Sequence, residues 1–318
     1  MTDLLYSNPI LGTALWGWTV SYQKACQLAD RFIEHGGRWF DTATNYPING
    51  SSANFGTAIQ WLAKWLQSRN ITDANVIVKL GACHNDGSPD IDLSPYRLAK
   101  LIVEQQETFG CNLRIVSIHW DNRSNINQIS DTVNEFRKAL DSNLGIGLSG
   151  IQYPEVYAKI APDLVQEWWV QVKCNPFDHA AYGRYSAFHG TGRFLAYGLN
   201  SGGYKRDGYY HSNNSATVRQ IDFSPSRTAA INTFLDNPSD CEFFPQTFNQ
   251  LSILSTTILE DVSGLILGPS SISQLEDSYS YLRSLSRARG NEILNRELKE
   301  LQQNVKQKII KINRSKLP

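Results

Sequence analysis

Several features that mark other classes of protein are missing from this chain of 318 residues. Its five cysteines are scattered and show no Cys-x-x-Cys or Cys/His spacing, which argues against a disulfide framework or a metal site. No run of ~18 apolar residues is present, so we expect no membrane-spanning helix. Lys and Arg (30) balance Asp and Glu (30), which disfavours nucleic acid as the main partner.

The first twelve residues, MTDLLYSNPILG, contain no basic segment followed by an apolar one, so we expect no signal peptide. Together with the unpatterned cysteines, this predicts a cytoplasmic protein. Hydrophobic residues make up 41% of the chain, which is enough for a large core.

Short apolar runs alternate with longer segments of helical character. Several runs are continuously apolar, as buried parallel strands are. The segments that we expect to be strands are 9–15, 38–43, 75–81, 113–120, 145–150, 168–174, 193–198 and 264–269. Helix signals separate them, such as Ser94 as an N-cap before Pro95. This alternation predicts an α/β fold, a (β/α)8 TIM barrel formed as one domain over residues 1–318.

Residues 288–318 are expected to form an appended C-terminal helix and tail. A single apolar stripe follows helical spacing along this segment: Leu294, Leu298, Leu301, Val305, Ile309 and Ile312. Five basic residues and no acid lie between Lys306 and Lys316. The helix could pack on the barrel or bind a partner. In the second case the protein could form a homo-oligomer through this helix.

A long interval, residues 199–263, separates the last two expected strands and opens with a polar stretch. Loops that follow strands lie at the active end of such a barrel. The stretch is therefore either a mobile flap over the site or an ordinary surface loop.

Four residues whose side chains could take part in catalysis lie on or after three consecutive expected strands. Asp41 ends the second strand, Tyr46 lies in the following loop, Lys79 lies near the end of the third strand, and His119 ends the fourth. Neighbouring strands are about 4.8 Å apart. We therefore expect the four side chains to meet at one edge of the barrel.

A lysine inside an apolar strand needs a counter-charge, because lysine is almost never fully buried unless it is paired. Asp41 is suitably placed for this. Alone, each residue could as well form a structural ion pair or hydrogen bond. Together they suggest that Lys79 lowers the pKa of Tyr46 from its ordinary value of ~10, making it a general acid for a carbonyl oxygen. His119 would hydrogen-bond that oxygen or share in proton relay.

At this point the sequence resembles the aldo-keto reductases. The matching motifs run in the family's order from about residue 10 to 280: LGTALWGW, FDTATNY, VIVKLG, SIHWDN, IGLSG, VQVKCNPFD, LAYGLNSGG and LILGPSSISQLEDSY. The resemblance implies a (β/α)8 barrel and NADPH-dependent reduction of a carbonyl group. It also implies that Asp41, Tyr46, Lys79 and His119 form the catalytic tetrad, with Tyr46 as the acid.

The same resemblance implies a set of cofactor-binding positions: Thr13, Ser149, Gln171, Tyr197, Leu199, Ser201, Gly268, Ser270, Ser271 and Gln274. Two departures from the family pattern stand out. Gly150 replaces the Asn that usually follows the Ser, and GLNSGG replaces a Ser-Pro-Leu run. No basic residue accompanies Ser270 and Ser271, where one often binds the 2′-phosphate. NADPH is favoured mildly, and NADH stays open.

Trp16, Trp18 and Trp120 flank the expected active end and are candidates for substrate binding; packing at the top of the barrel is the alternative. Aromatic rings beside polar residues suit a sugar or polyol-type carbonyl, although a simple aldehyde fits too. Two other functions are compatible with the sequence. One is a non-catalytic, cofactor-binding regulatory or partner subunit of the same fold. The other is a barrel isomerase or dehydratase that uses the Tyr and Lys without hydride transfer.

Overall fold

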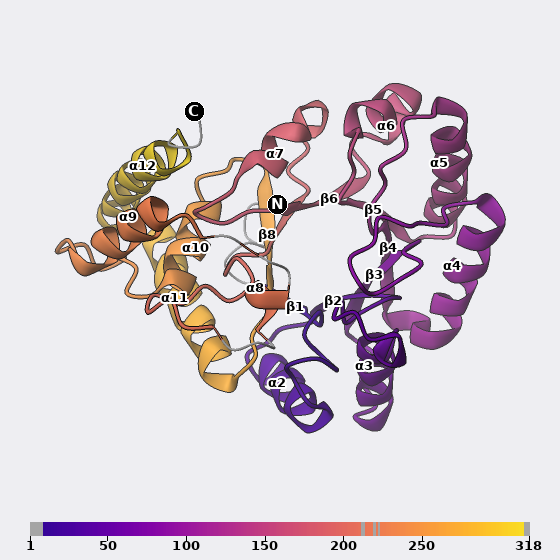
Figure 1. Cartoon of the computed structure of the whole chain (residues 1–318), viewed down its shortest axis with the longest axis horizontal. Coiled ribbons are helices and arrows are strands. Elements are labelled where there is room, and N and C mark those ends of the chain that lie inside the picture. The colour runs from indigo at the N-terminus through magenta and orange to yellow at the C-terminus, as the bar shows by residue number, and fades with distance from the viewer. Residues whose placement is uncertain (1–8, 211–213, 219–220, 222, 315–318) are drawn as a thin grey trace.

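The computed structural model describes residues 9–210, 214–218, 221 and 223–314, and it contains a closed barrel of eight parallel strands paired in chain order (Figure 1). The strands are β1 (Ile10–Gly12), β2 (Trp39–Ala43), β3 (Asn75–Leu80), β4 (Leu113–Ile118), β5 (Gly145–Ser149), β6 (Trp168–Lys173), β7 (Phe194–Tyr197) and β8 (Val262–Leu267). The predicted TIM barrel is confirmed.

All eight observed strands overlap the expected ranges but differ from them by one to three residues at one end or both, and two of the differences have a clear structural reason. β1 ends at Gly12 and not at residue 15, because the chain turns there and the Trp16 N–H donates to the Thr13 carbonyl at 2.9 Å. β8 begins at Val262, since Val262 pairs with Phe194 of β7. Boundaries of this kind depend on pairing partners that the local sequence does not show.

Helices surround the strands (Figure 1). They are α2 (Tyr22–Glu34), α3 (Thr57–Ser68), α4 (Pro95–Phe109), α5 (Ile126–Asp141), α6 (Pro154–Ile160), α7 (Ala180–Arg184), α8 (Ser215–Val218), α9 (Pro225–Asp236), α10 (Phe248–Thr256), α11 (Ile272–Arg289) and α12 (Glu292–Arg314). Local sequence determines several starts. The Asn125 side chain accepts a hydrogen bond from the Gln128 N–H at 3.1 Å, and Pro95 occupies the first turn of α4.

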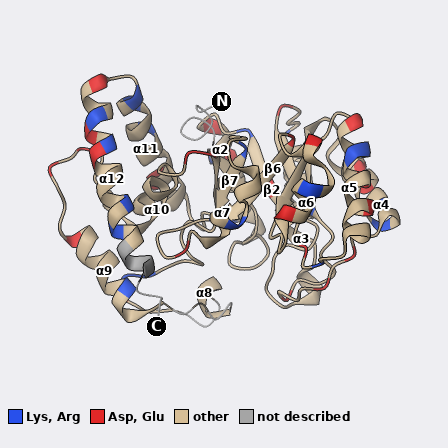
Figure 2. Cartoon of the chain, turned by 90° about the horizontal axis from the view of Figure 1, so that it is seen from above, with Lys and Arg blue, Asp and Glu red and all other residues tan. Residues whose placement is uncertain are grey.

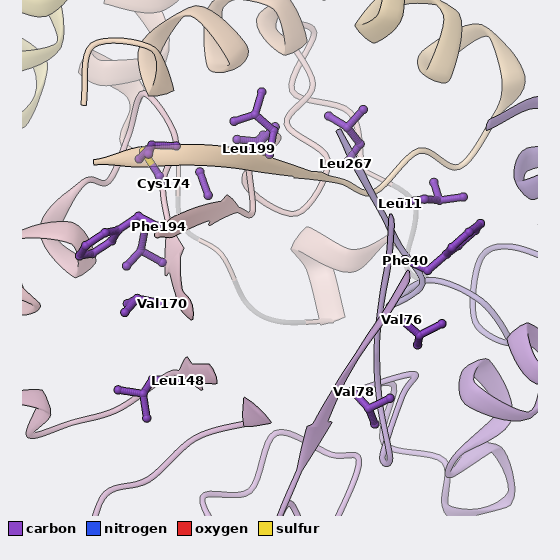
Figure 3. Packing of buried hydrophobic residues seen from close by; sticks show 14 of the residues in the cluster. Leu11, Phe40, Val76, Val78, Leu148, Val170, Cys174, Phe194, Leu199 and Leu267 are labelled. Carbon is purple, nitrogen blue, oxygen red and sulfur yellow. The ribbon is translucent and has the colours of Figure 1, made fainter. Parts of the chain in front are cut away.

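Alternate side chains of each strand point to opposite sides, so the barrel has two apolar layers. The outward-facing side chains pack beneath the helices, and Figure 3 shows examples such as Phe40, Val78 and Leu148. A second, smaller cluster lines the interior. It is formed by Ile10, Ile77, Ile115, Leu195 and Ile266, with Trp39, Trp169 and Tyr197 packed against it.

In the described part of the chain, the interval between β7 and β8 contains the helices α8, α9 and α10. An aromatic cluster anchors its first part. Tyr204 lies 5.1 Å from Phe177, 5.3 Å from Phe223 and 4.4 Å from Phe248, measured between ring centroids. The flap predicted from the polar stretch includes residues 211–213, 219–220 and 222, which lie outside the described residues.

The C-terminal helix α12 packs against α9, α10 and α11. The predicted stripe is buried at Leu298, Leu301, Val305 and Ile309. The side chain of Ile312 and residues 315–318, which include Lys316, lie outside the described part of the chain. Figure 2 shows charged residues of both signs along α11 and α12. The appended helix is confirmed, and its apolar stripe is used within the chain.

Candidate active site

The Asp41–Lys79 pair lies inside the carboxyl end of the barrel, on the neighbouring strands β2 and β3. Lys79 Nζ forms an ion pair with Asp41 Oδ2, and the two side chains are only 2% and 5% exposed. Gln171 Nε2 donates to the other carboxylate oxygen at 2.7 Å, from β6 across the interior. Thr13 Oγ1 donates to the backbone carbonyl of Asp41 at 3.1 Å. Asp41 is therefore held by contacts from three other strands or loops.

Burial alone would lower the pKa of Lys79, because it disfavours the charged ammonium. Attraction to Asp41 and to Tyr46, with hydrogen bonds to both, outweighs burial, so the pKa of Lys79 is raised above its ordinary value. The ammonium thus stays positively charged at neutral pH.

Tyr46 and His119 complete the group. Lys79 Nζ lies 4.8 Å from the centroid of the half-buried Tyr46 ring. The ring of His119 meets that of Tyr46 edge-on, with centroids 5.3 Å apart, and is itself packed on Trp120 at 4.1 Å. The structure therefore brings together the four residues that the sequence placed on three strand ends.

Two asparagines that the sequence analysis missed hold the Tyr46 loop in place. Asn85 Nδ2 donates to the carbonyls of Pro47 at 3.1 Å and Ser51 at 2.7 Å. Asn45 Nδ2 donates to the His84 carbonyl at 2.7 Å. Both asparagines are buried, and they join the loop after β2 to the loop after β3. Their only sequence signal was an amide side chain in a loop, which is too common to be informative.

The residues expected to hold a nicotinamide lie around the same opening. Ser149 of β5 pairs in register with Gln171 of β6, and both are buried, while Tyr197 at the end of β7 is half-buried. Gly150 has a φ of +60°, and a Cβ there would lie 3.0 Å from Trp120 Cβ. An Asn at this position, which usually follows the Ser in the motif described above, would not fit here without a shift of the backbone.

The expected adenosine-side residues surround the start of α11. Ser271 is its N-cap and accepts from the Gln274 N–H at 3.3 Å. Gln274 Oε1 accepts from the Ser270 N–H at 2.7 Å. Gly268 is exposed beside them. These polar groups bond to one another in this structure, and residues 268–274 include no Lys or Arg.

A hydrogen-bonded link joins this segment to the loop after β7. Asn200 Nδ2 donates to Asn249 Oδ1 at 2.9 Å, and Asn249 Nδ2 donates to Asp277 Oδ2 at 2.8 Å. Leu199 and Ser201, also expected to bind cofactor, are buried on either side of Asn200. The link sets the spacing between the two segments. No sequence signal marked it, because its members lie in three separate elements.

The three candidate tryptophans do not share one environment. Trp16 is 1% exposed and packs in the core, so we remove it from the candidate substrate site. Trp18 and Trp120 are half-buried near the opening and stay candidates.

Within the described residues, no group of His, Cys, Asp and Glu side chains is arranged to hold a metal ion. No helix in that part of the chain has both the length and the apolar character needed to cross a membrane.

Comparisons with known proteins bear on the family and the fold. Residues 10–293 match the model of the Aldo/keto reductase family. A norsolorinic acid reductase of Emericella nidulans is 28% identical over 203 residues, a match that spans 59% of this chain and 44% of that protein. The match with this chain therefore covers less than half the length of that relative.

Two solved structures share the fold. One is the holo form of an aldo-keto reductase from Bacillus halodurans, with a TM-score of 0.63 at 15% identity, covering 86% of this chain and 85% of the other. The second is a Pseudomonas aeruginosa protein provisionally assigned as an aldo-keto reductase. Its TM-score is 0.58 at 16% identity, covering 88% and 91% of the two chains.

Proposed function

Because the chain belongs to the aldo-keto reductases, a family of NAD(P)H-dependent oxidoreductases, we propose that it reduces an aldehyde or ketone with Tyr46 as the general acid. One observation carries the proposal: a buried ammonium, held by Asp41, lies beside the ring of Tyr46. A buried ion pair is often no more stabilising than apolar side chains of the same volume, so fold stability alone is a weak explanation for this lysine.

The side chains around the opening suit a nicotinamide. Ser149 and Gln171 offer buried polar groups for a carboxamide, and Tyr197 offers a ring face for stacking. The start of α11 would hold the adenosine end through Ser270, Ser271 and Gln274, with Thr13, Leu199, Ser201 and Gly268 as further contacts. A bound cofactor would supply hydride to the carbonyl carbon.

The protein's own residues would manage the proton. The Lys79 ammonium favours loss of the Tyr46 proton, because a positive charge stabilises the phenolate that remains. Asp41 keeps that lysine charged and in place. His119 would donate a hydrogen bond to the carbonyl oxygen, so that the oxygen is held while negative charge develops on it.

The finer assignments follow from the same site. We favour NADPH over NADH, with the hydroxyls of Ser270 and Ser271 at the 2′-phosphate. Trp18 and Trp120 would line a pocket for a sugar or polyol-type carbonyl. We place the protein in the cytoplasm. A homo-oligomer through α12 would have to use its exposed face, where Ile293 and Ile310 lie, since the stripe is buried.

The direct test is Tyr46→Phe, assayed by NADPH and NADH oxidation against a panel of aldehydes and ketones. Loss of the acid should lower turnover by about 10²–10⁴-fold. Quenching of tryptophan fluorescence should show that cofactor still binds. Tyr96→Phe, at a tyrosine 81% exposed on α4, is the matched control. Turnover at the native rate by the Tyr46→Phe variant would contradict the proposal.

One other result would favour a different function. If the unaltered protein binds a dinucleotide tightly but reduces nothing in the panel, the cofactor-binding regulatory subunit becomes the better description.

A further inference from the structure

A second lysine faces the opening of the barrel. Along β6, Val170 and Val172 point outward into the core beneath the helices, whereas Trp169 and Gln171 point into the interior. Alternation of side chains therefore places Lys173, the last residue of the strand, on the interior side, one step closer to the opening than Gln171. It pairs in register with Tyr197 of β7.

The structure leaves room for this side chain beside the opening. Gly198 follows Tyr197, and a Cβ at Gly198 would lie 3.2 Å from Lys173 Cγ. The absence of a side chain at Gly198 thus allows the lysine stem to pass. Lys173 is half-buried, as is typical of a lysine whose stem packs against the protein while its ammonium stays accessible.

The charge of Lys173 is not balanced in the described part of the protein. No ion pair joins it to any acid among those residues. Asp41 already neutralises Lys79, and Asp178, a little further along the chain, accepts a hydrogen bond from the Ala180 N–H at 3.0 Å. The Lys173 ammonium is therefore not paired with an acid in the described part of the chain.

We propose that Lys173 recognises an anionic group, a carboxylate or a phosphate, on the carbonyl substrate. The inference rests on the proposed function and specifies its substrate class. An ammonium that pairs with no acid among the described residues can form a charge-assisted hydrogen bond with an anion that reaches it. Tyr46 and His119 would receive the carbonyl at one side of the opening, and Lys173 would receive the anion from the β6 side.

The same ammonium could instead meet a phosphate of the cofactor, and the experiment separates the two sources. Para-carboxybenzaldehyde and its uncharged methyl ester form a matched substrate pair. For the unaltered protein, kcat/KM should favour the carboxylate. Lys173→Met should lower the ratio of kcat/KM for the carboxylate to kcat/KM for the ester by about tenfold or more, mainly by raising the KM for the carboxylate. Lys173→Arg should restore most of the ratio.

Lys159→Met removes an exposed lysine on α6 and should leave the ratio unchanged. An unaltered ratio in Lys173→Met would overturn the inference. So would weaker binding of NADPH by that variant with equal losses for both substrates, because it would assign the lysine to the cofactor.

Binding measured without turnover separates this inference from the proposed function. Calorimetric titration with benzoate and with neutral benzamide, in the presence of oxidised cofactor, should show a preference for benzoate that Lys173→Met abolishes. If the protein reduces no carbonyl but retains this preference, the proposed function fails and the anion site stands. Equal binding of the two compounds by the unaltered protein would refute the anion site even if reduction is observed.

Discussion

The two ends of the barrel interior are built from the same strands yet differ in character. At the amino end, Trp39 and Ile77 pack with other apolar side chains. Two positions further along the same strands, the interior holds Asp41 and Lys79. β6 changes in the same way, from Trp169 to Gln171. A single step of the strand repeat thus separates a layer that stabilises the fold from a layer that can perform chemistry.

The largest effect that tests this contrast is expected from Lys79→Met at the carboxyl end. Turnover should fall by about 10²–10⁴-fold, because Tyr46 loses its positive neighbour. The free energy of unfolding should fall by about 3–5 kcal/mol, because Asp41 is left buried without its counter-charge. Denaturant titration and steady-state kinetics measure the two losses.

The double variant Asp41→Asn/Lys79→Met is the control, and it should recover stability without recovering turnover. The pH dependence provides a second check. Because the pKa of Lys79 is raised in the folded protein, the Asp41–Lys79 pair stabilises the folded state at neutral pH. This stabilisation is lost as the pH rises through the raised pKa. A stability difference between the native protein and Lys79→Met that is already absent at neutral pH would contradict this.

A smaller effect, confined to stability, is expected at the amino end. Ile115→Ala should lower the free energy of unfolding by about 2–5 kcal/mol, since it opens a cavity in the interior layer. The kcat/KM of the folded variant should match that of the native protein. Ile293→Ala, at a residue 73% exposed on α12, should change stability by no more than about 0.5 kcal/mol. A large loss of kcat/KM in Ile115→Ala would show that the two layers are coupled.

The smallest effect is expected from Ser270→Arg, at the start of α11. A guanidinium beside the 2′-phosphate should raise the preference for NADPH over NADH by about tenfold, equivalent to ~1.4 kcal/mol. The ratio of the two dissociation constants, measured by fluorescence quenching, reports the change. An unchanged ratio would place the 2′-phosphate away from this segment.

Much of the fold could be predicted from the sequence because its strands are continuous apolar runs separated by helix signals. The Asp41–Lys79 pair was also predictable, since a lysine within an apolar strand demands a partner. The burial of Trp16 could not be predicted, because proximity along the chain to an active end does not show which way a ring points.

Contacts across the barrel could not be predicted in this way. Gln171 reaches Asp41 from a strand 130 positions away in sequence, and that contact exists only because the sheet closes on itself. Lys173 could have been found, because the alternation that places Gln171 inside places Lys173 there too. Lys173 did not stand out because it lies at a strand end, where polar residues are common.

The burial of the α12 stripe has a consequence for shortened forms of the protein. A chain that stopped at Gly290 would expose to water the apolar surfaces of α9, α10 and α11 that Leu298, Leu301 and Val305 now cover. A continuous apolar surface of this kind promotes self-association. We therefore expect a form truncated before α12 to aggregate, although it would retain every residue of the candidate active site.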